Sequence, residues 1–130
     1  MDRDALRAWL AAYERIWRAD AADELDTLFA DDATYRTEPF AEPYRGRGAI
    51  AAMWPDEAGA AFTVDFDVVA VDGAVGVVRA DVRYTAPRPQ RFLDLWIVRL
   101  GADGRCVAFE EWPFWPPGTP GGYDAAPYCC

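Results

Sequence analysis

The strongest constraint on the fold is a series of long strand-like segments in the second half of the chain. Apolar and polar residues alternate from Phe62 to Ala70, which is the period-two pattern of a half-buried β-strand. A partner strand at residues 75–85 follows Asp72-Gly73, a dipeptide typical of tight hairpin turns. Two more strands are predicted at residues 92–100 and 107–115. Four successive strands of this kind favour an antiparallel sheet.

The chain is predicted to begin with an amphipathic helix at residues 4–19. Apolar side chains recur there at three- and four-residue steps, so that they share one face of a helix. The members of this face are Leu6, Trp9, Leu10, Tyr13, Ile16 and Trp17. Such a face needs an apolar surface to cover, and the predicted sheet provides one.

Two shorter helices and a short strand are expected between the first helix and the long strands. Asp20 is a suitable N-cap for a second helix, which Asp31-Asp32 is expected to end. A short strand is predicted at residues 33–38. The third helix is expected to end at Trp54, because Pro55 disfavours a helical conformation of the residue before it.

These elements predict one α+β domain at residues 1–115, with three N-terminal helices packed on a curved, mostly antiparallel sheet. Helices on one face of such a sheet leave a conical cavity, whereas the other face is uncovered. Its apolar side chains are Leu93, Leu95, Ile97 and Trp112. An exposed apolar sheet face indicates a partner, so we expect a homodimer. Residues 116–130 form a Pro- and Gly-rich tail that ends in Cys129-Cys130.

The composition limits the partners and the chemistry that this chain can have. The formal net charge is −9 and all 13 positive residues are Arg without a basic stripe, which excludes nucleic acid and anionic membrane surfaces as expected partners. The chain has no His, so acid–base chemistry would fall to Asp, Glu or Tyr. No metal-binding spacing of Cys is present, and we expect neither a metal nor a cofactor. The start lacks the apolar core of a signal peptide, which predicts a cytoplasmic protein.

Asp94 is the first candidate for chemistry. It shares a strand face with Phe92, Trp96 and Val98. One interpretation is a buried carboxyl group, protonated or hydrogen-bonded inside a pocket. The other is a wetter face, with Asp94 near the rim and paired to an Arg such as Arg91.

Glu111 and Tyr13 are the next candidates. If Val107 and Phe109 point into the cavity, Glu111 is a second internal carboxyl group, and two carboxyl groups in an apolar site suit acid–base work. The alternative is a salt bridge from Glu111 to an Arg on a neighbouring element. Tyr13 either directs its hydroxyl into the cavity as a hydrogen-bond donor or is a core residue bonded to a backbone carbonyl.

Three stretches carry a resemblance to a known family. They are Leu28-Phe29-Ala30-Asp31-Asp32-Ala33-Thr34, the helix start from Arg45-Gly46 to Ile50, and Asp103-Gly104-Arg105. With the order of elements around them, they resemble the SnoaL-like and ketosteroid-isomerase-like branches of the nuclear transport factor 2-like superfamily. The resemblance implies a cone-shaped fold with one deep pocket, and it covers about Ala5 to Trp115.

In the isomerase branch, a helix Tyr and a strand Asp hold the oxyanion of the substrate, and another acid moves the proton. The resemblance places Tyr13 and Asp94 at the first two positions. Glu38, which precedes a Pro, is the candidate for the third, although strict counting selects Thr37. The residues expected to line the pocket are Trp17, Tyr35, Phe40, Trp54, Phe66, Tyr84, Trp96 and Phe109.

Two functions from different classes follow. The first is a small-molecule pocket that acts as a cofactor-free isomerase, cyclase or dehydratase on a hydrophobic carbonyl compound. Asp94, with Glu38 or Glu111, would move the proton, and Tyr13 would polarise the oxygen. The second is a non-catalytic ligand-binding or dimerisation module, in which the carboxyl groups are ion-paired and Trp17, Trp54 and Trp96 fill the pocket.

Overall fold

A computed structural model describes residues 1–117 of the chain, and its helices and strands follow the predicted order. The helical elements are α1 (Arg3–Ala19), the 3-10 helix η1 (Ala22–Thr27) and α2 (Arg47–Met53). The strands are β1 (Phe29–Arg36), β2 (Tyr44–Arg45), β3 (Ala61–Asp72), β4 (Val75–Ala86), β5 (Gln90–Leu100) and β6 (Cys106–Phe114). The predicted tail therefore lies almost wholly outside the described residues.

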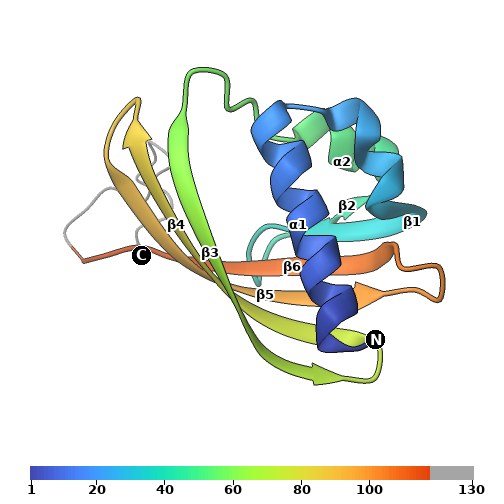
Figure 1. Cartoon of the computed structure of the whole chain (residues 1–130). Coiled ribbons are helices and arrows are strands. Elements are labelled where there is room, and N and C mark those ends of the chain that lie inside the picture. Colours follow the sequence, from blue (N-terminus) through green and yellow to red (C-terminus); the bar gives the residue numbers. More distant parts are fainter. Residues whose placement is uncertain (118–130) are drawn as a thin grey trace.

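All six strands belong to one sheet with the order β2-β1-β6-β5-β4-β3. Neighbouring strands are antiparallel except β1 and β6, which run parallel. The long strands bend strongly, and α1 lies across the concave side (Figure 1). This architecture confirms the predicted α+β fold of helices packed on a curved, mostly antiparallel sheet.

The predicted apolar face of α1 is the face that packs on the sheet. Asp2 caps the helix by accepting a hydrogen bond from the backbone N–H of Ala5 at 2.8 Å. All six predicted apolar residues of the helix are buried. The contact is closest at Gly76 of β4, where an added Cβ would lie 2.4 Å from a methyl group of Leu6. Glycine therefore sets the distance between helix and sheet at this point.

Two local predictions were wrong. The second helix is a six-residue 3-10 helix, and its N-cap residue Ala21 makes no side-chain hydrogen bond; Asp20 instead ends α1 with a left-handed backbone, φ 52°. The strand after it begins at Phe29 rather than at residue 33, because Phe29 pairs with Cys106 of β6. Tertiary pairing thus overrides the break signalled by Asp31-Asp32, which remains exposed at an irregularity in the ladder.

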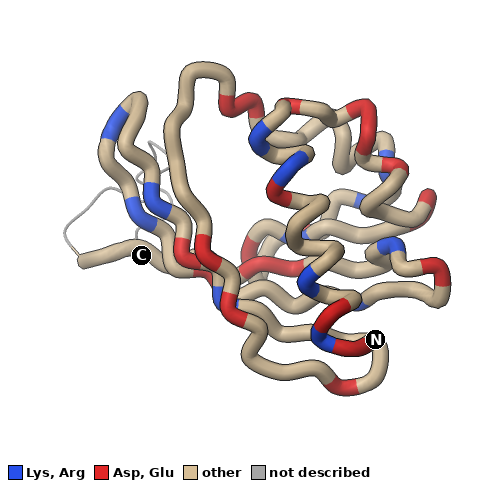
Figure 2. The backbone as a smooth tube through the Cα atoms, viewed as in Figure 1, with Lys and Arg blue, Asp and Glu red and all other residues tan. Residues whose placement is uncertain are grey.

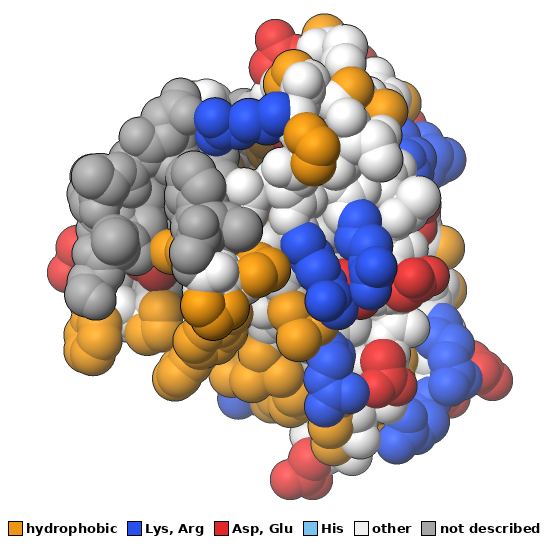
Figure 3. Space-filling model, turned by 90° about the vertical axis from the view of Figure 1, so that its left-hand side faces the viewer, with side chains coloured by type: hydrophobic (Ala, Val, Ile, Leu, Met, Phe, Trp, Pro, Cys, Tyr) orange, Lys and Arg blue, Asp and Glu red, His pale blue; other side chains and the backbone are white. Residues whose placement is uncertain are grey.

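The convex face of the sheet carries the exposed apolar side chains. Leu93, Trp112 and Phe114 are 40%, 37% and 61% exposed. Hydrophobic side chains gather on one side of the molecule, next to Arg and acidic side chains (Figure 3). Charged residues of both signs are also interleaved along the strands (Figure 2). Among residues 1–117, the apolar side chains of this face remain partly exposed, and the predicted homodimer stays a prediction.

Among residues 1–117, no helix is both long and apolar enough to cross a membrane.

Candidate active site

The concave side of the sheet encloses a cavity of about 680 Å³. Its walls come from α1, the end of β1, the segment after α2, and strands β4, β5 and β6. The lining residues are Tyr13, Trp17, Tyr35, Thr37, Met53, Pro55, Glu57, Val82, Tyr84, Pro87, Arg88, Gln90, Phe92, Asp94, Trp96, Glu111 and Pro113. This volume falls in the range of small-molecule sites, and most of the lining is aromatic or apolar.

Two carboxyl groups meet in this cavity. Asp94 pairs with Pro113 and Glu111 pairs with Trp96 in the β5–β6 ladder, so the two acids are diagonal neighbours on the concave face. Asp94 is 7% exposed, and its Oδ2 accepts a hydrogen bond from Trp96 Nε1 at 3.3 Å. Its Oδ1 is buried and receives no hydrogen bond from an N–H or hydroxyl group of the described residues.

The two carboxyl groups influence each other's pKa. Burial raises the pKa of Asp94 from its ordinary 3.8 to about 6, and a hydrogen bond from Glu111 moderates that increase. Burial and the charge of Asp94 raise the pKa of Glu111 well above 4.5. The hydrogen bond lowers one pKa and raises the other, so Glu111 holds the proton and donates it to Asp94. Glu111 also keeps some exposed surface, as expected for a group at a cavity wall.

The Arg partners considered for these acids lie elsewhere. Arg91 points to the convex face, where it and Arg83 hold Asp81 at 3.0 and 3.1 Å. Hydrogen bonds from these two guanidinium groups lower the pKa of Asp81. The structure therefore gives Asp94 the buried environment and pairs Glu111 with Asp94.

Two tyrosines form the second polar group of the cavity. The hydroxyls of Tyr13 and Tyr35 lie 2.6 Å apart and share a hydrogen bond. Burial raises the pKa of Tyr13 well above 10, and the charge of Glu111 adds to the increase. Both phenols are thus held neutral, as hydrogen-bond donors. Each ring also stacks on Phe109, with centroids 5.8 and 4.4 Å away, which fixes its orientation.

A third carboxyl group was missed by sequence reasoning. Glu57 follows α2 and lines the cavity, where its Oε1 accepts hydrogen bonds from Tyr84 Oη at 2.7 Å and Trp17 Nε1 at 3.4 Å. The segment Pro55–Ala60 has no periodicity that would have directed attention to it. Its only signal was an acidic residue in a turn close to a predicted aromatic face.

The other predicted site residues occupy different environments. Tyr35, Tyr84 and Trp96 line the cavity with Trp17, as expected. Trp54 and Phe109 are buried in the core, and Phe66 is half-buried against it. None of these three is among the lining residues of the large cavity.

The segment after β1 differs most from expectation. Phe40 is fully exposed, so its prediction as a pocket residue was wrong: the chain turns outward after Pro39 and leaves the ring in solvent. Thr37 rather than Glu38 lines the cavity, as strict counting from the family pattern gave. The proposed role of Glu38 in proton transfer stays a prediction, without support from its position.

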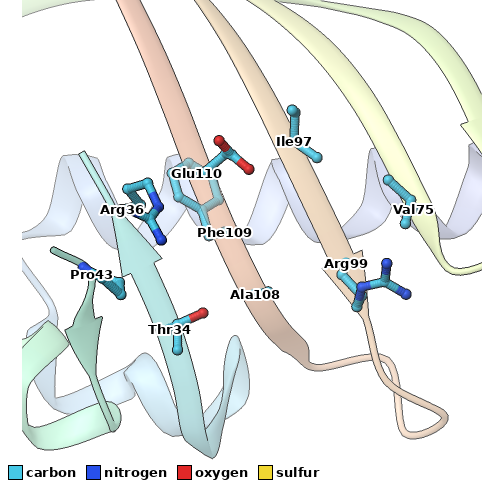
Figure 4. A pocket seen from close by; sticks show the side chains of 9 residues that line it. All are labelled: Thr34, Arg36, Pro43, Val75, Ile97, Arg99, Ala108, Phe109 and Glu110. Carbon is cyan, nitrogen blue, oxygen red and sulfur yellow. The ribbon is translucent and has the colours of Figure 1, made fainter. Parts of the chain in front are cut away.

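A smaller cavity of about 260 Å³ lies on the convex face (Figure 4). Thr34 and Arg36 of β1, Ile97 and Arg99 of β5, and Glu110 of β6 contribute to its lining. Glu110 points to this side, opposite to Glu111, as strand alternation requires. Within the described part of the chain, no group of three or more His, Cys, Asp or Glu is arranged to hold a metal ion.

Comparisons with known proteins agree with this geometry. Three solved structures are similar over most of their length. An LEH-like epoxide hydrolase of M. tuberculosis has 19% identity and a TM-score of 0.68, covering 85% of this chain and 82% of that one. A steroid delta-isomerase from Pseudomonas aeruginosa has 21% identity and a TM-score of 0.65, covering 90% and 83%. SalBIII, an epoxide hydrolase/cyclase-like enzyme of pyran ring formation in salinomycin, has 14% identity and a TM-score of 0.66, covering 87% and 93%.

At these identities the solved structures establish the fold alone. No functionally curated protein matches the chain in sequence. The sequence profile of the SnoaL-like domain, however, matches residues 3–109, which is most of the chain. The cone of helices on a bent sheet is the fold that the resemblance implied. The chain therefore belongs to the SnoaL-like family.

Proposed function

We propose that this protein is a cofactor-independent enzyme that moves a proton within a hydrophobic carbonyl compound. The observation that carries the proposal is the Asp94–Glu111 pair, in which a buried acid and a partly buried acid share one proton at the wall of an aromatic cavity. Buried acid pairs with separated pKa values are typical of acid–base sites. The similar folds of an isomerase and of epoxide hydrolase-like enzymes support the same class of chemistry.

The proposed reaction is isomerisation next to a carbonyl group. The Asp94 carboxylate accepts a proton from the carbon beside the carbonyl, and the C–H electron pair moves to the oxygen as an enolate. Tyr13 donates a hydrogen bond to that oxygen, which stabilises the developing charge, while Glu111 keeps its hydrogen bond to Asp94. Asp94 then returns the proton to a different carbon, so the enzyme ends in its starting protonation state.

A non-catalytic binding module is the alternative. It predicts a pocket filled by large side chains, whereas Trp17 and Trp96 line a cavity of about 680 Å³ and Trp54 lies behind it in the core. A volume below roughly 100 Å³ would have favoured the alternative, since ligand sites usually exceed a few hundred. The volume supports a ligand-binding cavity, and the Asp94–Glu111 pair favours an enzyme over a non-catalytic binder.

The direct test is isomerisation of a β,γ-unsaturated cyclic ketone in D₂O, followed by NMR. We expect deuterium at the carbon beside the carbonyl and formation of the conjugated ketone, both dependent on Asp94. A protein that binds the ketone without exchange or conversion would support the binding module. Exchange that persists unchanged in Asp94→Asn would remove Asp94 from the mechanism.

We also propose that the chain forms a homodimer through the convex sheet face. The support is the set of exposed apolar side chains on that face, including Leu93, Trp112 and Phe114. Burying such a group between two copies would remove it from water.

A further inference from the structure

Glu57 introduces a negative group at a part of the cavity away from the Asp94–Glu111 pair. Its Oε1 accepts from Tyr84 Oη at 2.7 Å and from Trp17 Nε1 at 3.4 Å. Both partners are donors, so the Glu57 carboxyl group accepts both hydrogen bonds through one oxygen. Its position at the cavity wall makes this carboxyl group available to a bound molecule.

The two residues that hold this carboxyl group belong to a row of aromatic rings. Trp17 and Phe62 have centroids 4.5 Å apart, and Phe62 and Tyr84 have centroids 5.2 Å apart. The guanidinium of Arg18 lies 4.4 Å from the centroid of Phe62, so this group of rings already attracts one cation of the protein. Rings beside a carboxylate are the chemistry that recognises alkylammonium groups.

The register of the sheet shows how far the Glu57 site lies from the Asp94–Glu111 pair. Tyr84 pairs with Gln90, whereas Ala80, four residues earlier on β4, pairs with Asp94. Four residues of a strand span about 13 Å. A ligand that reaches both places is therefore elongated, with a length of roughly 10 Å between its two polar groups.

The charges at the cavity wall also favour a cation. Three of the described lining residues are acids, namely Asp94, Glu111 and Glu57, and one, Arg88, is basic. With Glu111 counted as protonated, two acids still face one basic residue. Asp94 in addition has a buried Oδ1 without an N–H or hydroxyl donor among residues 1–117. An acidic, aromatic cavity attracts cations and disfavours carboxylates and phosphates.

We propose that the cavity binds a molecule with an alkylammonium group, held by Glu57 and the rings of Trp17 and Tyr84. The carbonyl group at its other end lies at Asp94, and this second half of the assignment rests on the proposed function. The ammonium subsite depends only on Glu57 and its aromatic neighbours. Together, the two halves of the proposal identify the substrate class as a hydrophobic amino ketone.

Two probes of equal shape test the subsite in the full chain. Benzyltrimethylammonium carries the charge, and neopentylbenzene replaces its nitrogen by carbon. Binding is followed by tryptophan fluorescence, because Trp17 touches Glu57. Glu57→Gln keeps the size of the side chain and an oxygen that can accept hydrogen bonds from Tyr84 and Trp17. We expect this variant to bind the ammonium about tenfold more weakly and to bind the neutral probe with unchanged affinity. Glu110→Gln, on the convex face, is the matched control and should change neither.

The proposal is overturned if the ammonium does not bind, or if Glu57→Gln weakens both probes equally. It is also overturned if phenylacetate binds and the ammonium does not. That result would mean that Arg88 makes this part of the cavity an anion-binding site. These results are independent of turnover. Ammonium binding without Asp94-dependent isomerisation would reject the proposed reaction and keep the subsite, whereas isomerisation without ammonium binding would do the reverse.

Discussion

Asp94 and Glu111 lie on adjacent strands, face the same cavity and share a hydrogen bond. Two like-charged groups at such close range cannot both ionise at ordinary pH. Folding therefore places a proton donor and a proton acceptor side by side in an aromatic environment, in a chain that has no His.

Removing the acceptor should abolish proton transfer. We expect Asp94→Asn to lower kcat by about 10²- to 10⁴-fold, the usual contribution of a positioned base, with little change in ligand affinity. The measurement is the rate of deuterium exchange into a cyclic ketone. Glu110→Gln is the control, because Glu110 points to the convex face. A similar loss in that variant would indicate a general effect on folding rather than on the site.

The acid pair should make folding stability depend on pH. The folded pKa of Asp94 is about 6 and its ordinary value is 3.8, so the folded protein binds more protons between these pH values. Its contribution to the unfolding free energy is complete below the lower value and is lost as the pH rises through the higher one. The loss is roughly 3 kcal/mol for two pKa units.

Urea unfolding across this pH window checks that expectation. The unfolding free energy of the wild type, minus that of Asp94→Asn, should become smaller as the pH rises from 3.8 to about 6. Asp67→Asn, at an exposed ion pair with Arg79, is the control for the loss of one carboxyl group at the surface. Parallel curves for wild type and Asp94→Asn would mean that Asp94 titrates normally in the folded protein.

The tyrosine pair should contribute to both stability and catalysis. Tyr13→Phe removes one partner of a buried hydrogen bond and leaves the Tyr35 hydroxyl unpaired, which costs about 1–3 kcal/mol. It also removes a donor to the developing enolate, so kcat should decrease more than ligand affinity. Equal kcat in wild type and Tyr13→Phe would limit Tyr13 to a core role.

The approach of α1 to the sheet should depend on one glycine. Gly76→Ala would place a Cβ 2.4 Å from Leu6 and should destabilise the protein by about 1–3 kcal/mol. Gly48→Ala, in α2 with no atom within 4 Å of the added carbon, should instead be neutral or stabilise by up to about 1 kcal/mol. Thermal unfolding of the two variants distinguishes them; equal melting temperatures would show that α1 moves freely to accommodate a side chain.

The proposed homodimer should depend on the convex face. Leu93→Asp puts a charge among the exposed apolar side chains and should convert a dimer into a monomer with little loss of fold stability. Light scattering after size-exclusion chromatography measures the mass. A wild-type monomer at working concentration would contradict the proposal, and so would a dimer that survives Leu93→Asp.

The long strands and α1 were predicted well from the sequence. In each of them apolar side chains recur with a regular period, which places them on one face of the element. The hairpin at Asp72-Gly73 forms as expected, with Gly73 in a left-handed conformation, φ 61°. The parallel pairing of β1 with β6 was not predicted. It depends on contacts between residues far apart in the chain, for which local periodicity contains no information.

The site was predictable in part for the same reason. Strand alternation placed Asp94 and Glu111 on plausible faces, but their diagonal contact follows from the β5–β6 register, which the sequence alone leaves open. Glu57 lies in an irregular segment and becomes a cavity residue through its hydrogen bonds to Tyr84 and Trp17. Loops carry no periodic signal, so such a residue becomes evident only in three dimensions.

The shared proton is the central claim, and carboxyl ¹³C NMR during a pH titration tests it most directly. With labelled Asp and Glu, we expect Asp94 to titrate near pH 6 and Glu111 to lose its proton only after Asp94, with each signal responding to the other transition. Asp94→Asn and Glu111→Gln assign the two signals. Independent transitions of both groups near their ordinary pKa values would contradict the account, since the two acids would then be separate, solvated carboxylates at the cavity wall.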